Sequence, residues 1–139
     1  HDIIVCMDDD DYYPPSSVLG RVKLLLKYSH INCVGCNNIG VFDIFNKRSY
    51  LASDGPKYFS EATLAFRKSF WDNRPFYKND KQGEGKFFCL YRESEMMSIP
   101  FQFVIIALKH HHNTTNNIRN ISESNSGQQK SDLFQFEFY

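Results

Sequence analysis

The stretch that decides the fold is residues 3–15, which read IIVCMDDDDYYPP. Residues 2–7 form an apolar, β-branched run, and this pattern predicts a buried strand. Four consecutive carboxylates followed by two prolines cannot continue a strand, so residues 8–15 are predicted to form a loop. A serine then caps a predicted helix over residues 17–28. We expect the core-facing side of this helix to carry four apolar residues and a flanking leucine: Val18, Val22, Leu25, Leu26 and Leu19.

Short elements follow this strand, loop and helix along the chain. The predicted strands are 32–36, 39–45, 49–52, 62–66 and 101–108, and the predicted helices are 68–73 and 85–92. Residues 46–48 are a turn signal, so the second and third of these strands are expected to form a hairpin. Residues 77–85 are polar and are predicted to be a surface loop. The order of strands and helices predicts an α/β layer fold.

Composition limits the class of protein. The 139 residues suffice for one small domain, and 42% of them are apolar, which predicts a packed core. Sixteen basic residues balance sixteen acidic ones, so no overall positive field favours a nucleic acid partner. The longest apolar run, residues 103–108, is too short to cross a bilayer. We expect a folded part over residues 1–119, followed by a polar tail over residues 120–139 that ends in a short strand-like segment.

The four cysteines predict a reducing compartment. Cys33 and Cys36 have the spacing of a zinc or redox pair, but no second pair completes a zinc site and no helix start follows. We therefore interpret them as strand positions with reduced thiols. Cys6 and Cys89 lie inside apolar runs, where a free cysteine behaves as a small buried side chain. This cysteine usage favours an intracellular, cytoplasmic location.

The four aspartates at residues 8–11 carry the strongest chemical signal. Neighbouring carboxylates repel one another by about 1 kcal/mol per pair even in water, and packing gives no reason to place four at a strand end. A divalent cation reverses that cost, and hard oxygen ligands suit Mg²⁺ or Mn²⁺. The simpler interpretation is a solvated acidic turn before a helix. The position after a predicted buried strand favours the metal site, because ligands bind at this edge of α/β sheets.

The same residues resemble the GT-A glycosyltransferases, especially the family 2-like enzymes. Their pattern is a hydrophobic strand, then D-x-D-D and a proline, and Asp8, Asp10 and Asp11 match its three aspartates. Later segments follow the order of the family: SEATLAFRKSFW at 60–71, GEGKFF at 83–88 and FVIIALKHHHNTT at 103–115. The nearest likeness is to the small glycosyltransferases of large DNA viruses. It implies a Rossmann-like mixed sheet with flanking helices, without the N-terminal nucleotide-binding βαβ half.

The resemblance implies an inverting transfer of a sugar from a nucleotide diphosphate-sugar to a hydroxyl of a glycan or protein acceptor. It assigns Asp10 and Asp11 to a bound Mn²⁺ or Mg²⁺, which acts as a Lewis acid on the diphosphate. It assigns Asp8 and Asp9 to the donor, and Asp8 can also assist the metal. His110 and His112 follow the last predicted strand and are candidates to complete the metal shell.

An inverting transfer also needs a carboxylate base. Glu84 is the candidate, because it matches the acidic segment of the family and its two glycine neighbours let substrate approach. The family has a second acidic residue where this chain has Gly85. Asp80 and Glu61 are the reserve candidates, and a simpler role for Glu84 is to interact with a helix dipole.

Two other functions stay open from the sequence. One is a catalytically inactive GT-A remnant that acts as a binding or structural module, which the missing half and Gly85 favour. The other is a metal-dependent phosphoesterase or nuclease, which needs further ligands on other strands. Because a shortened domain exposes sheet edges, we also expect that pairing between copies can form an oligomer.

Overall fold

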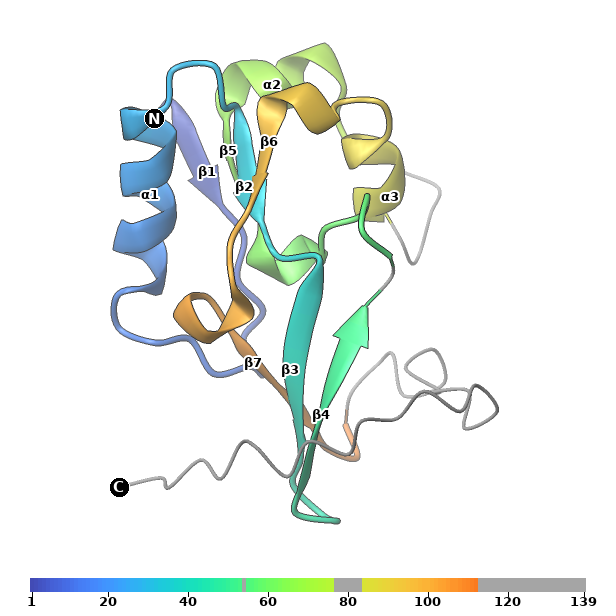
Figure 1. Cartoon of the computed structure of the whole chain (residues 1–139). Coiled ribbons are helices and arrows are strands. Elements are labelled where there is room, and N and C mark those ends of the chain that lie inside the picture. The colour runs from blue at the N-terminus through green and yellow to red at the C-terminus, as the bar shows by residue number, and fades with distance from the viewer. Residues whose placement is uncertain (54, 77–83, 113–139) are drawn as a thin grey trace.

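A computed structural model describes residues 1–53, 55–76 and 84–112. The α/β class is confirmed, because helices pack on two mixed sheets (Figure 1). The helices are α1 (Ser17–Lys27), α2 (Lys68–Asn73) and α3 (Glu84–Cys89), and the 3₁₀ turns are η1 (Glu61–Thr63), η2 (Glu93–Glu95) and η3 (Phe101–Phe103). The strands are β1 (Ile3–Val5), β2 (Cys33–Gly35), β3 (Asn38–Asp43), β4 (Arg48–Ser53), β5 (Ala65–Arg67), β6 (Met96–Ser98) and β7 (Ile106–Lys109).

The two sheets have different strand arrangements. The first has the order β1-β5-β2-β6, in which β5 is antiparallel to both neighbours and β6 is parallel to β2. The second has the order β4-β3-β7, with β3 and β4 antiparallel and β7 parallel to β3. The predicted hairpin is therefore confirmed as β3 and β4. It projects away from the first sheet, and its turn lies at one end of the molecule (Figure 1).

The prediction of a buried strand at residues 2–7 is wrong. β1 is an edge strand that pairs only with β5 in the part of the chain described, and Ile4 is exposed. Three residues paired on one side cannot be shielded on both faces and both edges. The strand leads into the acidic loop as predicted, and the N–H of Cys6 extends the pairing by donating to the carbonyl of Leu64 at 2.8 Å.

Helix α1 has nearly the predicted bounds but turns a different face to the core. Its buried residues are Ser17, Arg21 and Leu25, whereas Val18 and Leu26 are exposed. The reason is hydrogen bonding: the Arg21 side chain is needed by backbone carbonyls inside the protein, and Ser17 Oγ donates to the carbonyl of Val104 at 2.7 Å. The prediction from apolar periodicity missed this, because a polar pair and not an apolar stripe fixes the rotation of the helix.

The predicted strand over residues 101–108 is interrupted. Phe101 begins the turn η3, and only the last residues of the segment join β7. The Phe101 ring packs so closely against Gly40 of β3 that a Cβ on residue 40 would collide with the ring. The segment therefore first covers the second sheet with an aromatic ring and then pairs with it. The predicted strand at residues 62–66 is likewise divided into η1 and β5.

The remaining predictions divide into confirmed and untested ones. Helix 68–73 is confirmed as α2, and helix 85–92 corresponds to the shorter α3. Cys33 and Cys36 are buried free thiols, as predicted, and burial raises the pKa of Cys36 to about 12. Residues 77–83 and the tail beyond residue 112 lie outside the described residues. Within the described part, no helix is both long and apolar enough to cross a membrane.

Candidate functional site

The acidic loop, residues 8–15, is attached to β7 by backbone pairing. The N–H of Tyr12 donates to the carbonyl of Ile106 at 3.0 Å, and the N–H of Ile106 donates back at 2.8 Å. Beside this bridge, Asp11 Oδ1 accepts the N–H of Leu108 at 2.9 Å. Asp11 is therefore partly a structural residue, because it continues the edge of the second sheet where the loop passes.

Tyr13 connects the loop to the first sheet. Its hydroxyl accepts the N–H of Asp8 at 2.8 Å and donates to the carbonyl of Ala62 at 3.1 Å. Burial raises the pKa of Tyr13 to about 12, so the phenol stays neutral and can make both bonds. The backbone of Asp8 is thus fixed to the segment that precedes β5.

Three of the four aspartates come together. Asp8, Asp10 and Asp11 each offer a carboxylate oxygen, and these oxygens lie within 4.8 Å of one another. Asp8 and Asp10 are exposed, and Asp11 is half-buried. This spacing allows one divalent cation to contact all three, although exposed carboxylates also approach one another without a cation. Asp9, which the sequence assigned to the donor, is exposed and lies outside the cluster.

His110 joins this group, and His112 does not. His110 Nε2 lies 3.3 Å from Asp10 Oδ2, while His110 Nδ1 accepts the N–H of His112 at 3.2 Å. A ring nitrogen that accepts an N–H has no proton of its own, so the proton of the neutral ring is on Nε2 and faces Asp10. In this geometry His110 orients Asp10 and is not placed to bind a cation through Nε2. The exposed ring of His112 lies beyond it, with the two ring centroids 6.3 Å apart.

A buried cation lies beneath the loop. The Arg21 side chain is 1% exposed, and its Nη1 donates to the carbonyls of Cys6, Thr63 and Leu64 at 3.0, 3.1 and 3.3 Å. Its Nε and Nη2 bond to the carbonyl and hydroxyl of Ser17. Burial lowers the pKa of Arg21, and the ring of nearby carbonyl oxygens compensates its charge. Arg21 therefore fixes the end of β1, from which the acidic loop begins, against η1 and β5.

The candidate bases lie at different places. Glu84 is the first residue of α3, but its side chain and all of Asp80 are outside the described residues. Glu61 is the first residue of η1, and its Oε1 accepts the N–H of Gly85 at 2.6 Å. The structure thus places the reserve candidate Glu61 directly beside the segment on which Glu84 lies.

Sequence reasoning missed Tyr13, Arg21 and Ser17. Tyr13 is part of the predicted loop, but nothing in the amino-acid sequence distinguishes its role from that of Tyr12. Ser17 and Arg21 are four residues apart on the predicted helix, and this spacing places both on one face. A polar i,i+4 pair opening a helix just after an acidic loop was the available signal.

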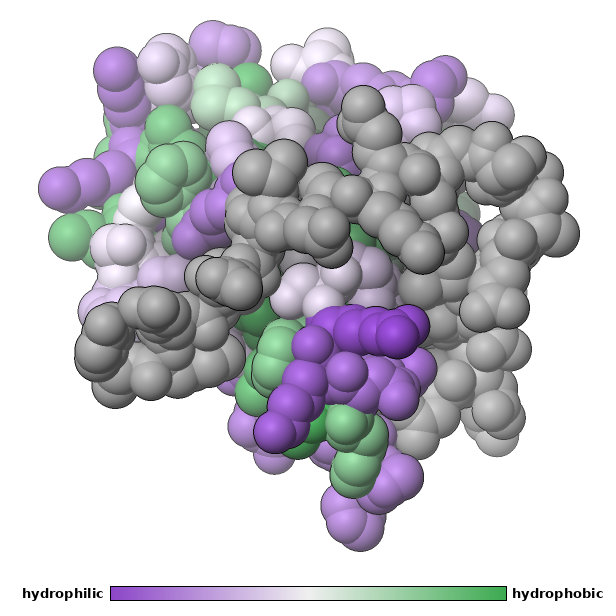
Figure 2. Space-filling view, turned by 60° about the horizontal axis from the view of Figure 1, so that its bottom comes forward, coloured by the Kyte–Doolittle hydropathy of each residue, from purple (hydrophilic) through white to green (hydrophobic). Residues whose placement is uncertain are grey.

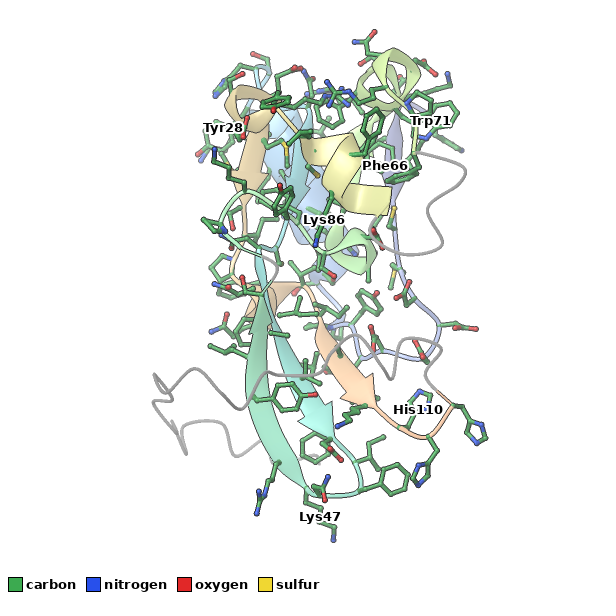
Figure 3. The ribbon with its side chains drawn as sticks, turned by 90° about the vertical axis from the view of Figure 1, so that its right-hand side faces the viewer. Tyr28, Lys47, Phe66, Trp71, Lys86 and His110 are labelled. Carbon is green, nitrogen blue, oxygen red and sulfur yellow. The ribbon has the colours of Figure 1, made fainter. Side chains whose placement is uncertain are left out.

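The hairpin turn lies at the same end of β7 as the loop. His110 lies between the acidic loop and the turn that carries Lys47 (Figure 3). From this end, hydrophilic and hydrophobic side chains lie next to one another on the surface (Figure 2), and the exposed apolar residues of the turn are Ile44 and Phe45. The Phe45 ring packs on His111, with centroids 3.6 Å apart.

Comparison with known proteins does not assign the chain to a family. No protein-family model matches the sequence, and no curated protein matches it.

Proposed function

We propose that the chain is the metal-binding and acceptor-side part of a GT-A glycosyltransferase similar to family 2. The proposed reaction transfers a sugar from a nucleotide diphosphate-sugar to a hydroxyl of a glycan or protein, with inversion, in the cytoplasm of the cell or, for a viral protein, of its host. The observation that carries the proposal is the meeting of the Asp8, Asp10 and Asp11 oxygens within 4.8 Å at the end of β1. The mixed α/β architecture is compatible with it.

The donor set suits the proposed cation. Asp8, Asp10 and Asp11 would hold Mn²⁺ or Mg²⁺, since both prefer carboxylate oxygens. When bound, the cation supplies positive charge that stabilises the leaving nucleoside diphosphate. His112 is not among the residues whose ligand atoms meet in this cluster, and His110 contacts Asp10 instead.

The protein residues hold the carboxylates in place. The Leu108 N–H fixes one oxygen of Asp11, the Nε2 proton of His110 faces Asp10, and Tyr13 fixes the backbone of Asp8. Each aspartate is therefore oriented from a different element: β7, the turn after β7, and the end of the loop itself. This arrangement reduces the entropy cost of collecting three carboxylates around one ion.

The test is titration of the full chain with Mn²⁺, alone and with UDP or GDP, followed by calorimetry and thermal melting. We expect the nucleoside diphosphate to stabilise the protein only when Mn²⁺ is present. Asp10→Ala should weaken Mn²⁺-dependent binding at least tenfold, or by about 1.4 kcal/mol, without lowering the melting temperature of the metal-free protein. Asp72→Ala is the matched control, because Asp72 is an exposed aspartate of α2 that lies outside the cluster.

The outcomes separate the candidate functions. Equal affinity in the wild type and Asp10→Ala contradicts the metal role of the cluster. Mn²⁺ binding without nucleotide binding supports the inactive remnant, in which the fold and cation site persist without a donor site. Release of phosphate from phosphodiester or phosphomonoester probes, with no use of sugar donors, supports the phosphoesterase alternative.

A further inference from the structure

We infer that Glu61, and not Glu84, is the carboxylate that takes the proton from the acceptor hydroxyl; this inference rests on the proposed function. The acceptor O–H bond breaks and its proton moves to Glu61. The acceptor oxygen forms the new bond to the anomeric carbon of the sugar, while the bond from that carbon to the diphosphate breaks and its electron pair stays on the diphosphate oxygen.

The backbone next to Glu61 is joined to the acidic loop. The carbonyl of the next residue, Ala62, accepts the Tyr13 hydroxyl, which itself accepts the N–H of Asp8. Two hydrogen bonds thus lead from the backbone of Asp8 to the residue after Glu61.

The orientation of Glu61 is fixed from the opposite side by α3. Its Oε1 accepts the N–H of Gly85 at 2.6 Å. A Cβ on residue 85 would lie 2.8 Å from Glu61 Cγ and 3.2 Å from Oε1, so the glycine leaves the space that this carboxyl group fills. Helix α3 is itself held by Phe88, whose fully buried ring lies edge-on to Phe66 and Phe70 with centroid distances of 5.0 and 5.1 Å.

This geometry leaves one oxygen for chemistry. Oε1 is used by Gly85, whereas Oε2 accepts no hydrogen bond from the described residues. The Glu61 side chain is half-buried, so it is shielded from bulk water on one side and open on the other. A base needs a fixed carboxylate with one accessible oxygen, and Glu61 has both properties. It is also distinct from the three carboxylates assigned to the cation.

The hydrogen bond from the Gly85 N–H to Glu61 Oε1 would also form if Glu61 only capped α3. The experiment must therefore separate this capping role from a role as a base. Glu61→Gln does this, because the amide oxygen of glutamine still accepts the Gly85 N–H while the side chain can no longer take a proton. Gly85→Ala perturbs the same carboxyl group from the other side, since the added Cβ displaces Glu61. Glu93→Gln is the matched control, an exposed glutamate in η2 that undergoes the same substitution.

The assay uses the full chain with Mn²⁺ and a panel of UDP- and GDP-sugars, with water as acceptor, and measures release of UDP or GDP. We expect Glu61→Gln to lower turnover about 10²- to 10⁴-fold while the affinity for Mn²⁺ with UDP or GDP and the melting temperature stay unchanged. Gly85→Ala should lower turnover in the same direction, and Glu93→Gln should not.

Three results overturn the inference in distinguishable ways. Turnover of Glu61→Gln within about threefold of the wild type removes Glu61 as the base and leaves the proposed function standing; loss of turnover in Glu84→Gln instead returns the role to Glu84. A wild type that binds the nucleotide with Mn²⁺ but turns over no donor shows that Glu61 does not act as a base. A wild type that binds no nucleotide with Mn²⁺ overturns the proposed function, and the role of Glu61 with it.

Discussion

Two consecutive residues at the end of β7 pair with aspartates of two different regions. Lys109 Nζ lies 3.3 Å from Asp43 Oδ2 at the hairpin turn, and His110 Nε2 lies 3.3 Å from Asp10 Oδ2 in the acidic loop. Asp43 is buried, whereas Asp10 is exposed. The two neighbouring regions therefore both use an aspartate to pair with the end of β7, but this aspartate is buried at the hairpin turn and exposed in the acidic loop.

The difference shows which carboxylates serve the fold. Asp43 Oδ1 accepts the N–H groups of Phe45 and Asn46 at 3.1 and 3.0 Å, and Oδ2 accepts the Asn46 side chain at 2.9 Å. These bonds close the turn. In the acidic loop, Asp11 Oδ1 accepts the N–H of Leu108, and the carboxylates of the cluster lie close enough to repel one another.

The largest expected contrast comes from neutralising one aspartate in each region. Asp43→Asn should destabilise the protein by about 1–3 kcal/mol, because a charged acceptor of several bonds is lost. The expected fall in melting temperature is about 3–10 °C. Asp10→Asn should leave the melting temperature of the metal-free protein unchanged or raise it slightly, since it relieves repulsion. Thermal melting of both variants without metal checks this, and similar destabilisation by both would break the comparison.

A smaller effect is expected from acid. The pKa of Asp43 is lowered from 3.8 to about 2, chiefly by the Asn46 N–H and further by Lys109. Because this folded-state pKa lies below the unfolded value, the stability that it contributes is present above about pH 4 and is lost as pH falls towards about 2. Melting curves of the wild type and Asp43→Asn should therefore differ at neutral pH and converge near pH 2. A constant difference across this range would contradict the assignment.

The sequence was informative where a signal is local. The acidic loop, the hairpin with its turn, and the approximate bounds of helix α1 follow from adjacent residues, chiefly prolines and turn formers. The predicted serine cap is wrong, because Ser16 at the N-cap makes no side-chain capping hydrogen bond and Ser17 Oγ donates to the carbonyl of Val104. The sequence could not show that Arg21 faces inward, because two of the carbonyls that it satisfies, those of Thr63 and Leu64, lie more than 40 residues away in the chain. Nor could it show that Glu61 meets Gly85, since 24 residues separate the two and only tertiary packing joins them.

The residues of the acidic cluster could be named from the sequence, whereas the contacts that hold them could not. Four consecutive aspartates are visible in the sequence, yet which three of them converge depends on the path of the loop. That path is set by two long-range contacts, the bridge between Tyr12 and Ile106 and the hydrogen bond from Tyr13 to the carbonyl of Ala62. His110 was named as a ligand from its position, whereas its Nδ1 contact with the backbone of His112 makes it a partner of Asp10.

The smallest expected effect concerns how the loop is held. Tyr13→Phe removes the hydroxyl that joins the Asp8 N–H to the Ala62 carbonyl and keeps the ring. We expect a loss of about 1 kcal/mol in stability, because two hydrogen bonds of a half-buried phenol disappear. We also expect Mn²⁺ affinity to fall a few-fold, since Asp8 loses its backbone anchor although every carboxylate remains.

Tyr12→Phe is the matched control for this change. Tyr12 pairs with β7 through its backbone, and its side chain is exposed. If Tyr13→Phe lowers stability without changing Mn²⁺ affinity, the anchor serves the fold alone, and the loop then holds its carboxylates together through Asp11 and the β7 bridge. If it lowers the affinity and Tyr12→Phe does not, the phenol belongs to the cation site. In that case the acidic loop resembles the hairpin turn after all, because a buried hydrogen-bond network would position its charges too.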